Sequence, residues 1–254
     1  MSAALATPPA ATEEQAAPLR LVCFAPAGGS SASFKTWPKA LAPEFLVQAV
    51  DLPGRATRRA DPPAESLVQQ ADELAPRLAG AGPYALLGHS LGGLLAYEVA
   101  KRISRDPDLR DPEFVVLAGS RPPHRSSSKV FAPLVELPDE QLLDALTEIG
   151  AVNPMLRTSP LRGLFVPALR NDLRLVVGYH PDPAEEPPRI SLAAWHAEDD
   201  HLAPPAVGTE WARYTSGDFT HTAFGGDHFF LYDRMPTVAS ALRAARDRAA
   251  RPLR

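Results

Sequence analysis

The sequence predicts an α/β fold, in which a mostly parallel central sheet is flanked by helices and a helical block is inserted between two of its strands. Two observations support this prediction. Short apolar runs alternate with helical patterns from residue 19 to residue 120, and this alternation stops at residue 121 and resumes at residue 190. Alternating strands and helices form parallel sheets with right-handed crossovers. The chain has 254 residues, of which 45% are hydrophobic, and this is enough for one domain with a sizeable core.

Four apolar runs in the first half of the chain are typical of strands, and three helical patterns separate them. The predicted strands span 19–25, 45–51, 84–89 and 113–120. The predicted helices span 33–42, 65–79 and 91–104, and Pro38 disturbs the first of them. The strand at 84–89, YALLGH, is apolar on both faces, as expected for a strand that is covered on both sides. These segments give the order β-α-β-α-β-α-β.

The second half begins with a segment, 121–189, in which no strand is predicted. Its helical patterns span 139–150 and 161–179, and Pro167 is expected to interrupt the second. Strands at 190–197 and 218–224, a helix around 205–214 and a closing helix from Pro236 to about 248 complete the predicted elements. The inserted block is expected to form a lid over the C-terminal edge of the sheet, where open α/β folds bind their ligands.

The predicted organisation is a disordered leader at 1–19, a core at 20–120 and 190–254, and a helical lid at 121–189. The net charge of −4 gives no reason to expect binding to nucleic acid or to membranes. The leader lacks the basic region of a secretory signal, and no stretch is long and apolar enough to cross a bilayer. The single cysteine, Cys23, cannot build a disulfide framework, which suits a reducing cytosol. We expect a cytoplasmic monomer with no metal site.

The most informative motif is GHSLG at 88–92, which matches G-x-S-x-G. It follows a predicted buried strand and opens a helix, as a nucleophile elbow requires. Ser90 would then project above the sheet, and the N–H of Leu91 would be free to meet an oxyanion. The alternative is a glycine-rich turn with a structural serine at a helix N-cap, which this context does not favour.

A serine nucleophile needs a base, and the base needs an acid that orients it. In this fold the order along the chain is serine, then acid, then histidine. The loops EDDHLAPP and GGDHFF follow the last two predicted strands and supply Asp200 and His228. Asp199 is the alternative acid. The other six histidines are set aside; His89, for example, points away from Ser90 by alternation.

The second oxyanion donor is expected in the loop after the first strand, APAGGSSASF. Pro26 has no N–H group, so Ala27 is the predicted donor. Gly28 and Gly29 would let the backbone approach a substrate. A phosphate-binding loop is a poor alternative, because no Lys-Ser or Lys-Thr follows at the required spacing.

The set FAPAGGSSASF, VDLPGR, GHSLGGLLAYEVA, RNDLRLVVGY, EDDHLAPP and GGDHFFL resembles the type II thioesterases of polyketide and nonribosomal peptide biosynthesis, which belong to the α/β-hydrolase superfamily. The resemblance runs from about residue 20 to residue 242. The family usually has Pro-His or Pro-Tyr before Ala-Gly-Gly, where this chain has Ala25 and Pro26. It often has glycine where this chain has Ala197.

The resemblance implies an editing function in antibiotic biosynthesis. Such enzymes hydrolyse acyl groups from the phosphopantetheine arm of acyl carrier or peptidyl carrier proteins, and thereby clear stalled synthases. The matching triad positions are Ser90, Asp200 and His228. No cofactor of the enzyme itself is implied, because the substrate is carried on the arm of the partner protein.

The lid is expected to supply an apolar chamber for the acyl group. The candidate lining residues are Leu142, Leu146, Leu164, Phe165, Leu169 and Val176. The basic run RATRR is expected near the mouth of this chamber, where Arg55, Arg58 and Arg59 could meet an acidic carrier protein or the phosphate of its arm. A solvated basic loop is an equally good interpretation of the run.

Three other functions remain open at this stage. A terminal thioesterase would release or cyclise a full-length product, and the short leader after Met1 argues against it. A general esterase or lipase would lack the motifs that resemble those of enzymes acting on carrier proteins. A non-catalytic binding module of the same fold would not need an intact triad.

Overall fold

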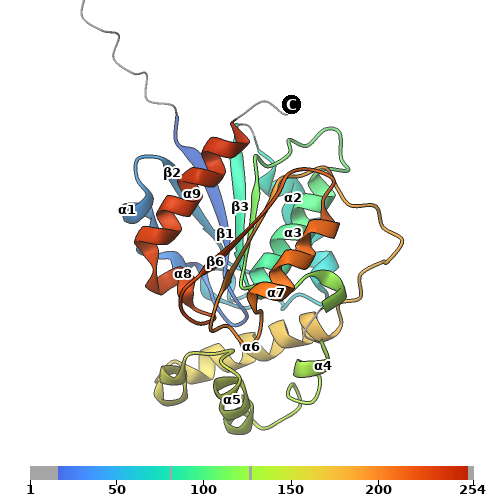
Figure 1. Cartoon of the computed structure of the whole chain (residues 1–254). Helices are drawn as coiled ribbons and strands as arrows, with labels where there is room; N and C mark the ends of the chain where they lie inside the picture. The colour runs from blue at the N-terminus through green and yellow to red at the C-terminus, as the bar shows by residue number, and fades with distance from the viewer. Residues whose placement is uncertain (1–16, 81, 126–127, 251–254) are drawn as a thin grey trace, which may run out of the picture.

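Six parallel strands form one central sheet in the order β2-β1-β3-β4-β5-β6 (Figure 1). The structure is a computed structural model that describes residues 17–80, 82–125 and 128–250. The strands are β1 Leu19–Phe24, β2 Phe45–Val50, β3 Tyr84–His89, β4 Val115–Ala118, β5 Leu192–Ala197 and β6 Phe219–Phe224. The predicted α/β fold class is therefore confirmed. Because β1 lies between β2 and β3, the strand order reverses there, and such a switch point opens a crevice at the C-terminal edge.

Helices cover both faces of this sheet and the edge where its strands end. The α-helices are α1 Trp37–Leu41, α2 Leu67–Leu78, α3 Leu91–Ile103, α4 Ser128–Phe131, α5 Asp139–Glu148, α6 Arg162–Val177, α7 Pro205–Gly208, α8 Phe230–Asp233 and α9 Met235–Ala249. Short 3₁₀ helices are η1 Ser31–Phe34, η2 Ala56–Arg58, η3 Pro123–Arg125, η4 Pro154–Thr158 and η5 Thr209–Tyr214. Within the described residues, no helix is both long and apolar enough to span a membrane.

Two hydrophobic cores lie on the two faces of the sheet. Helices α2 and α3 pack on one face against alternate strand residues such as Val22 and Leu86. Helices α1 and α9 pack on the other face against the intervening residues, such as Leu21 and Leu87. Both faces are thus covered, which explains why β3 reads as a continuous apolar run.

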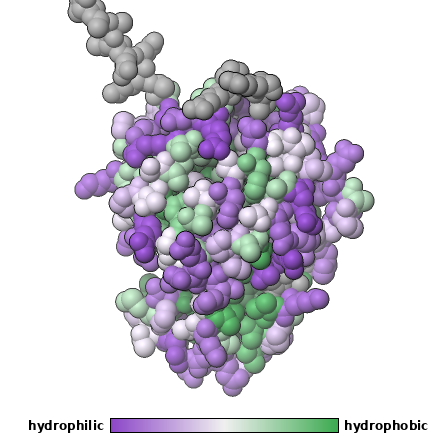
Figure 2. All heavy atoms as spheres, viewed as in Figure 1, coloured by the Kyte–Doolittle hydropathy of each residue, from purple (hydrophilic) through white to green (hydrophobic). Residues whose placement is uncertain are grey.

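The inserted segment lies across the C-terminal edge of the sheet, with α6 running beneath the strand ends in the view of Figure 1. It contains α4, α5 and α6, and no strand occurs in its described parts, 121–125 and 128–189. Figure 2 shows a patch of apolar residues (green) at the lower right, over these elements, with hydrophilic residues (purple) around it. Met155, Leu161 and Leu164 are among the exposed large apolar side chains of the insertion.

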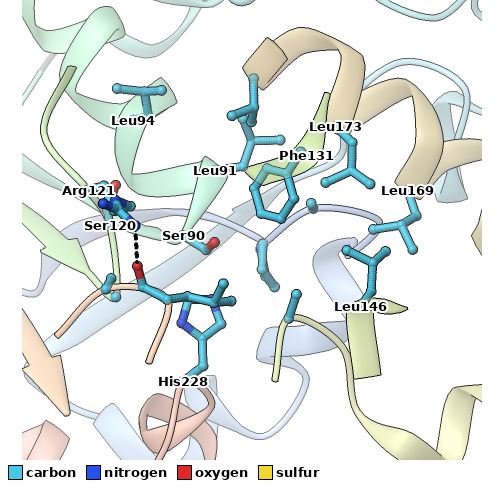
Figure 3. A pocket seen from close by; sticks show the side chains of 17 residues that line it. Ser90, Leu91, Leu94, Ser120, Arg121, Phe131, Leu146, Leu169, Leu173 and His228 are labelled. Atoms are coloured by element: carbon cyan, nitrogen blue, oxygen red, sulfur yellow. Dashed lines mark hydrogen bonds between the residues drawn. The ribbon is translucent and has the colours of Figure 1, made fainter. Parts of the chain in front are cut away.

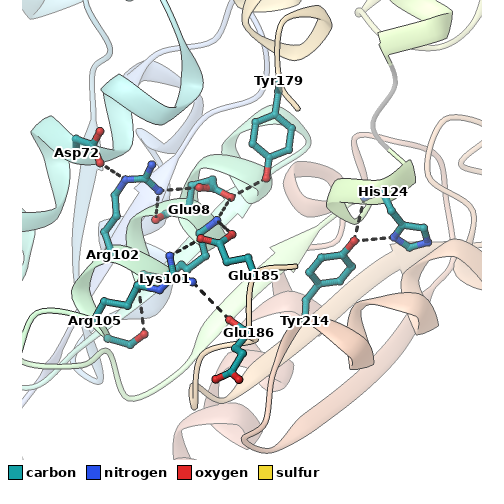
Figure 4. Close-up of polar contacts among 11 residues, drawn as sticks. Asp72, Glu98, Lys101, Arg102, Arg105, His124, Tyr179, Glu185, Glu186 and Tyr214 are labelled. Atoms are coloured by element: carbon teal, nitrogen blue, oxygen red, sulfur yellow. Dashed lines mark hydrogen bonds and ion pairs between the residues drawn. The ribbon is translucent and has the colours of Figure 1, made fainter. Parts of the chain in front are cut away.

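Polar contacts hold both ends of the insertion on the core (Figure 4). At its start, the N–H of His124 donates to the hydroxyl of Tyr214 in η5 over 3.0 Å. At its end, the hydroxyl of Tyr179 donates to the carboxylate of Glu98 in α3 over 2.6 Å. Glu98 also pairs with Lys101 over 2.8 Å, and both side chains are buried. The base of the lid is thereby fixed relative to α3, which begins at the GHSLG motif.

Three predicted helices differ from those observed. Helix α6 continues through Pro167 without a break, because buried residues on both sides of the proline, such as Val166 and Leu169, pack against the core. The helix predicted at 33–42 is divided into η1 and α1, with Pro38 in the first turn of α1, where a missing N–H removes no helical bond. The helix predicted around 205–214 is a short α7 followed by η5.

The predicted leader at 1–19 falls largely outside the described residues, which begin at residue 17. Strand β1 starts at Leu19, so this residue belongs to the sheet and not to the predicted leader. The predicted core boundary at residue 254 also lies outside the described residues, since the last described one is residue 250.

Candidate active site

Ser90 occupies a strained turn between β3 and α3. Its φ of 56° and ψ of −117° lie in a region that side-chain-bearing residues rarely adopt, and its N–H donates to Ala118 O over 2.8 Å. A Cβ atom on Gly88 would come within 1.9 Å of Gly92 O, and one on Gly92 within 2.4 Å of Phe24 O. Only glycine fits at either position. The strand–turn–helix geometry predicted for GHSLG is therefore present, and Ser90 lines a pocket at its tip (Figure 3).

His228 lines the same pocket and is hydrogen-bonded to Asp200. Nδ1 of His228 donates to Oδ2 of Asp200 over 2.7 Å, and both side chains are buried. Oδ1 of Asp200 accepts the N–H groups of Leu202 at 2.9 Å and Ala203 at 3.0 Å. Burial opposes the charge on Asp200, but the hydrogen bond from His228 and these backbone bonds outweigh it and hold the pKa of the carboxyl below its usual range. Asp199, the alternative acid, is exposed, so the geometry favours Asp200.

The side chain of His89 contacts both the backbone and the ring of His228. Its Nε2 donates to the backbone oxygen of His228 over 2.7 Å, and the two ring centroids lie 4.8 Å apart. Complete burial, with a smaller contribution from nearby His228, lowers the pKa of His89 to about 3, so the ring is neutral and can keep its other nitrogen beside Tyr232. The sequence predicts that His89 points away from Ser90 but gives no sign of this supporting contact, because nothing local pairs residue 89 with residue 228.

The predicted oxyanion donors, Ala27 and Leu91, line the same pocket. The N–H of Gly29 donates to Pro26 O over 2.8 Å and Gly28 has a φ of 74°, which together define a type II turn. Leu91 is the first residue of α3, where backbone N–H groups lack helical acceptors. In the part of the chain that the structure describes, neither the Ala27 nor the Leu91 N–H donates a hydrogen bond. Both donors are available to a ligand.

The apolar part of the pocket comes from the lid and from α3. Figure 3 shows its lid side chains gathered to one side of Ser90 and His228. The lining apolar residues include Leu94, Phe131, Leu146, Leu169, Leu173 and Val176. Phe131 and Leu173 were not predicted. Leu173 continues the 169–173–176 spacing on one face of α6, a signal that could have found it.

Three of the six residues predicted to line the chamber line this pocket, and three do not. Leu146, Leu169 and Val176 line the pocket. Leu142 is buried within the packing of the lid, because it lies one turn away on α5. Leu164 is 54% exposed on the outer face of α6. Phe165 lines a neighbouring pocket with Trp37 and Tyr232 instead.

The predicted basic contact surface also needs correction. Arg55 is buried and forms an ion pair with Asp172 of α6, so it cannot meet a partner protein. Arg58 pairs with Asp61 and Glu73. Arg59 is exposed, and its contact with a carrier stays a prediction. Across residues 17–80, 82–125 and 128–250, no group of three or more His, Cys, Asp or Glu side chains is placed to hold a metal ion.

A family model described as the thioesterase domain matches residues 19–245. The chain belongs to the thioesterase family. It is therefore a serine hydrolase that acts on thioesters, with an α/β-hydrolase fold.

Relatives and solved structures confirm the resemblance to type II thioesterases. The gramicidin S biosynthesis protein GrsT of Aneurinibacillus migulanus is 31% identical over 88% of this chain and 87% of its own length. The structure of RedJ, a thioesterase from the prodiginine biosynthetic pathway of Streptomyces coelicolor, is 32% identical, covers 94% of this chain and 96% of its own, and has a TM-score of 0.79. The type II thioesterase BorB from the borrelidin biosynthetic cluster is 30% identical, covers 91% and 94%, and has a TM-score of 0.78.

The thioesterase contains a second buried neutral histidine, which predicts how its stability depends on pH. Nε2 of His196 in β5 donates to Ser120 O over 3.0 Å, and burial lowers the pKa of His196 to about 4. An unfolded histidine binds a proton below a pH of about 6.5, whereas this folded one does not until a pH of about 4. The contribution of the neutral His196 ring to the free energy of unfolding is thus intact above about pH 6.5. It is lost as the pH falls toward 4, by about 1.4 kcal/mol per pH unit at most.

His196→Gln keeps an N–H donor and removes this titration. The slope of the unfolding free energy against pH is measured by urea denaturation between about pH 6.5 and 4. We expect this slope to fall by at most about 1.4 kcal/mol per pH unit, which corresponds to one bound proton. His201→Gln, which removes an exposed histidine, is the control. An unchanged slope in His196→Gln would contradict the assignment of a neutral buried ring.

Proposed function

We propose that this thioesterase is an editing enzyme that hydrolyses acyl groups from the phosphopantetheine arm of carrier proteins of a polyketide or nonribosomal peptide synthase. The observation that carries the proposal is the hydrogen bond of 2.7 Å between Asp200 and His228, which lines the same apolar pocket as Ser90. The pocket offers a place for an acyl chain, and it is lined by Ala27 and Leu91, whose N–H groups donate no hydrogen bond within the described residues.

In the proposed first half-reaction, Nε2 of His228 takes the proton of the Ser90 hydroxyl as the oxygen attacks the thioester carbonyl. The oxyanion that forms is stabilised by the N–H groups of Ala27 and Leu91. Asp200 keeps the proton of His228 on Nδ1 and stabilises the imidazolium. The sulfur of the arm then leaves as a thiol with the proton from Nε2 of His228, and Ser90 carries the acyl group as an ester.

In the second half-reaction, water gives a proton to Nε2 of His228 and attacks the acyl ester. The same two N–H groups stabilise the second oxyanion, and the Ser90 oxygen leaves with the proton from His228. The products are the free acid and regenerated enzyme. A thiol is a better leaving group than an alcohol, so the first half-reaction needs less help from the protonated histidine than the second.

The neighbouring pocket supports a pantetheine arm as the carrier of the acyl group. It shares Pro26 and Ala27 with the acyl pocket, so it lies directly beside the place of reaction. Its lining combines Trp37 and Phe165 with the polar side chains of Thr36 and Asn153. Such a mixture suits a flexible chain that contains both amide and methylene groups. The relatives named above come from gramicidin S, prodiginine and borrelidin biosynthesis, which supports a carrier protein as the partner.

The decisive experiment compares one short acyl group on two carriers. The kcat/KM for acetyl or propionyl on holo carrier protein is measured beside that for the same acyl group on N-acetylcysteamine. We expect the carrier substrate to be preferred by at least about tenfold, because protein contacts add binding energy that the small thioester lacks. Equal kcat/KM on both substrates would overturn the carrier-protein part of the proposal and leave a general thioesterase.

A further inference from the structure

A buried ion pair joins the lid to the turn that carries Ala27. The side chain of Asp172 in α6 is fully buried, and that of Arg55, which follows β2, is 7% exposed. Nη1 and Nη2 of Arg55 donate to the two carboxylate oxygens of Asp172 over 2.6 and 2.5 Å. The N–H of Gly28 donates to Oδ2 of Asp172 over 2.7 Å, and Nη1 of Arg55 donates to Gly29 O over 3.1 Å.

These contacts fix the peptide units of the turn. Pro26 O is held by the N–H of Gly29 within the turn, over 2.8 Å. In a trans peptide the N–H points opposite to the carbonyl, so the N–H of Ala27 is directed away from Gly29. The next peptide is held by Asp172 through Gly28, and the peptide after Gly29 is held by Arg55. The ion pair therefore restrains the turn on the side that its own hydrogen bond does not reach.

Helix α6 also packs directly on this turn. A Cβ atom on Gly28 would lie 2.7 Å from the ring of Phe165 and 3.0 Å from Cβ of Leu169. Leu169 lines the acyl pocket, one helical turn before Asp172 (Figure 3). The contact between α6 and the turn at Gly28 thus determines three things. These are the position of α6 on the core, the shape of the acyl pocket and the direction of the Ala27 N–H.

We propose that Asp172 and Arg55 are positioning residues that hold the Ala27 N–H in the direction needed for the oxyanion, so that full turnover requires α6 to be seated on the turn. This inference rests on the proposed function, because it takes Ala27 as an oxyanion donor. The pair acts on the transition state through the backbone of the turn and does not touch the acyl group.

A role of the Arg55–Asp172 pair in positioning the turn can be tested separately from a role in the stability of the fold. A buried ion pair is often replaced by apolar side chains of similar volume with little change in stability, because desolvation offsets much of its attraction. Arg55→Met combined with Asp172→Leu should therefore fold. It removes the acceptor of Gly28 N–H and the donor to Gly29 O, and so frees the turn.

The test measures kcat, KM and the inhibition constant of a trifluoromethyl ketone that forms an oxyanion adduct on the nucleophile. For Arg55→Met combined with Asp172→Leu, we expect kcat to fall about 10- to 100-fold, up to the loss seen when an oxyanion donor is removed, with KM within about threefold. Affinity for the ketone should fall in proportion to kcat. Asp172→Asn keeps an oxygen that can accept from Gly28, so its loss in kcat should be smaller.

Lys101→Met is the matched control, because it removes a buried cation from the Glu98 network at the base of the lid. We expect it to lower the melting temperature and to leave kcat within about twofold. The positioning role is overturned if the double variant keeps wild-type kcat, or if only KM changes. It is also overturned if Lys101→Met reduces kcat and ketone affinity equally. A failure of the proposed function looks different, since the wild-type kcat/KM would then be equal on the carrier protein and on the N-acetylcysteamine thioester.

Discussion

Replacing Ser90 with alanine is expected to lower kcat for thioester hydrolysis by about 10⁴- to 10⁶-fold, the range found when the nucleophile of a serine hydrolase is removed. The reason is that no other hydroxyl takes its place at the tip of the elbow, so no acyl-enzyme forms. The fold should persist, because the strained turn is held by the backbone bond from Ser90 N–H to Ala118 O and by the close packing at Gly88 and Gly92. Mass spectrometry after rapid quenching should show the acyl adduct on the wild type and none on Ser90→Ala.

Ser120→Ala supplies the matched control for this prediction. Ser120 lines the same pocket, and its buried hydroxyl has no hydrogen-bond partner among the described residues. Its removal should change kcat by no more than about threefold, since a residue outside the triad gives no nucleophile. An acyl adduct on Ser90→Ala, or its loss in Ser120→Ala alone, would assign the nucleophile to Ser120.

The elements that place the triad could be predicted because their signals are local. The strand before Ser90 is a buried apolar run, and the glycines around it fit only a tight strand–helix crossing. Asp200 and His228 directly follow β5 and β6, and parallel strands bring their C-terminal ends to one edge. No long-range information was needed to place these three side chains at one edge of the sheet.

The partners of Arg55 could not be predicted, because its environment is decided by tertiary contacts. In the sequence it belongs to the basic run RATRR, which is typical of a solvated loop. In the structure a carboxylate 117 residues away neutralises it in the interior. A single sequence gives no signal for such a pair, so the role of Asp172 was missed together with that of Arg55.

The lid is the region where periodicity was least informative. Leu142, Leu146, Leu164 and Leu169 are chemically alike, and only the orientation of α5 and α6 on the core decides which ones face Ser90. The continuity of α6 through Pro167 has a similar cause. Burial of neighbouring residues outweighs the cost of one missing helical hydrogen bond, which propensity alone does not weigh.

Asp200→Asn is expected to lower kcat by about 10³- to 10⁴-fold while leaving substrate binding nearly unchanged. The oxygen of the new amide can still accept the N–H groups of Leu202 and Ala203. Its NH₂ group then faces Nδ1 of His228 and forces that nitrogen to become an acceptor. The ring proton moves to Nε2, where His228 can no longer take a proton from Ser90.

Asp199→Asn is the comparison that makes this prediction decisive, because the two carboxyl groups are neighbours in sequence and differ in burial. Asp199 is exposed, and its backbone N–H is bonded to Gly226 O over 3.0 Å. Its substitution should keep kcat within about twofold, as expected for a solvated surface group. Circular dichroism and melting curves show whether both variants are folded, and steady-state kinetics on the same acyl thioester give the two values of kcat. A larger loss of kcat in Asp199→Asn than in Asp200→Asn would mean that the hydrogen bond of 2.7 Å between His228 and Asp200 does not set the tautomer of the base.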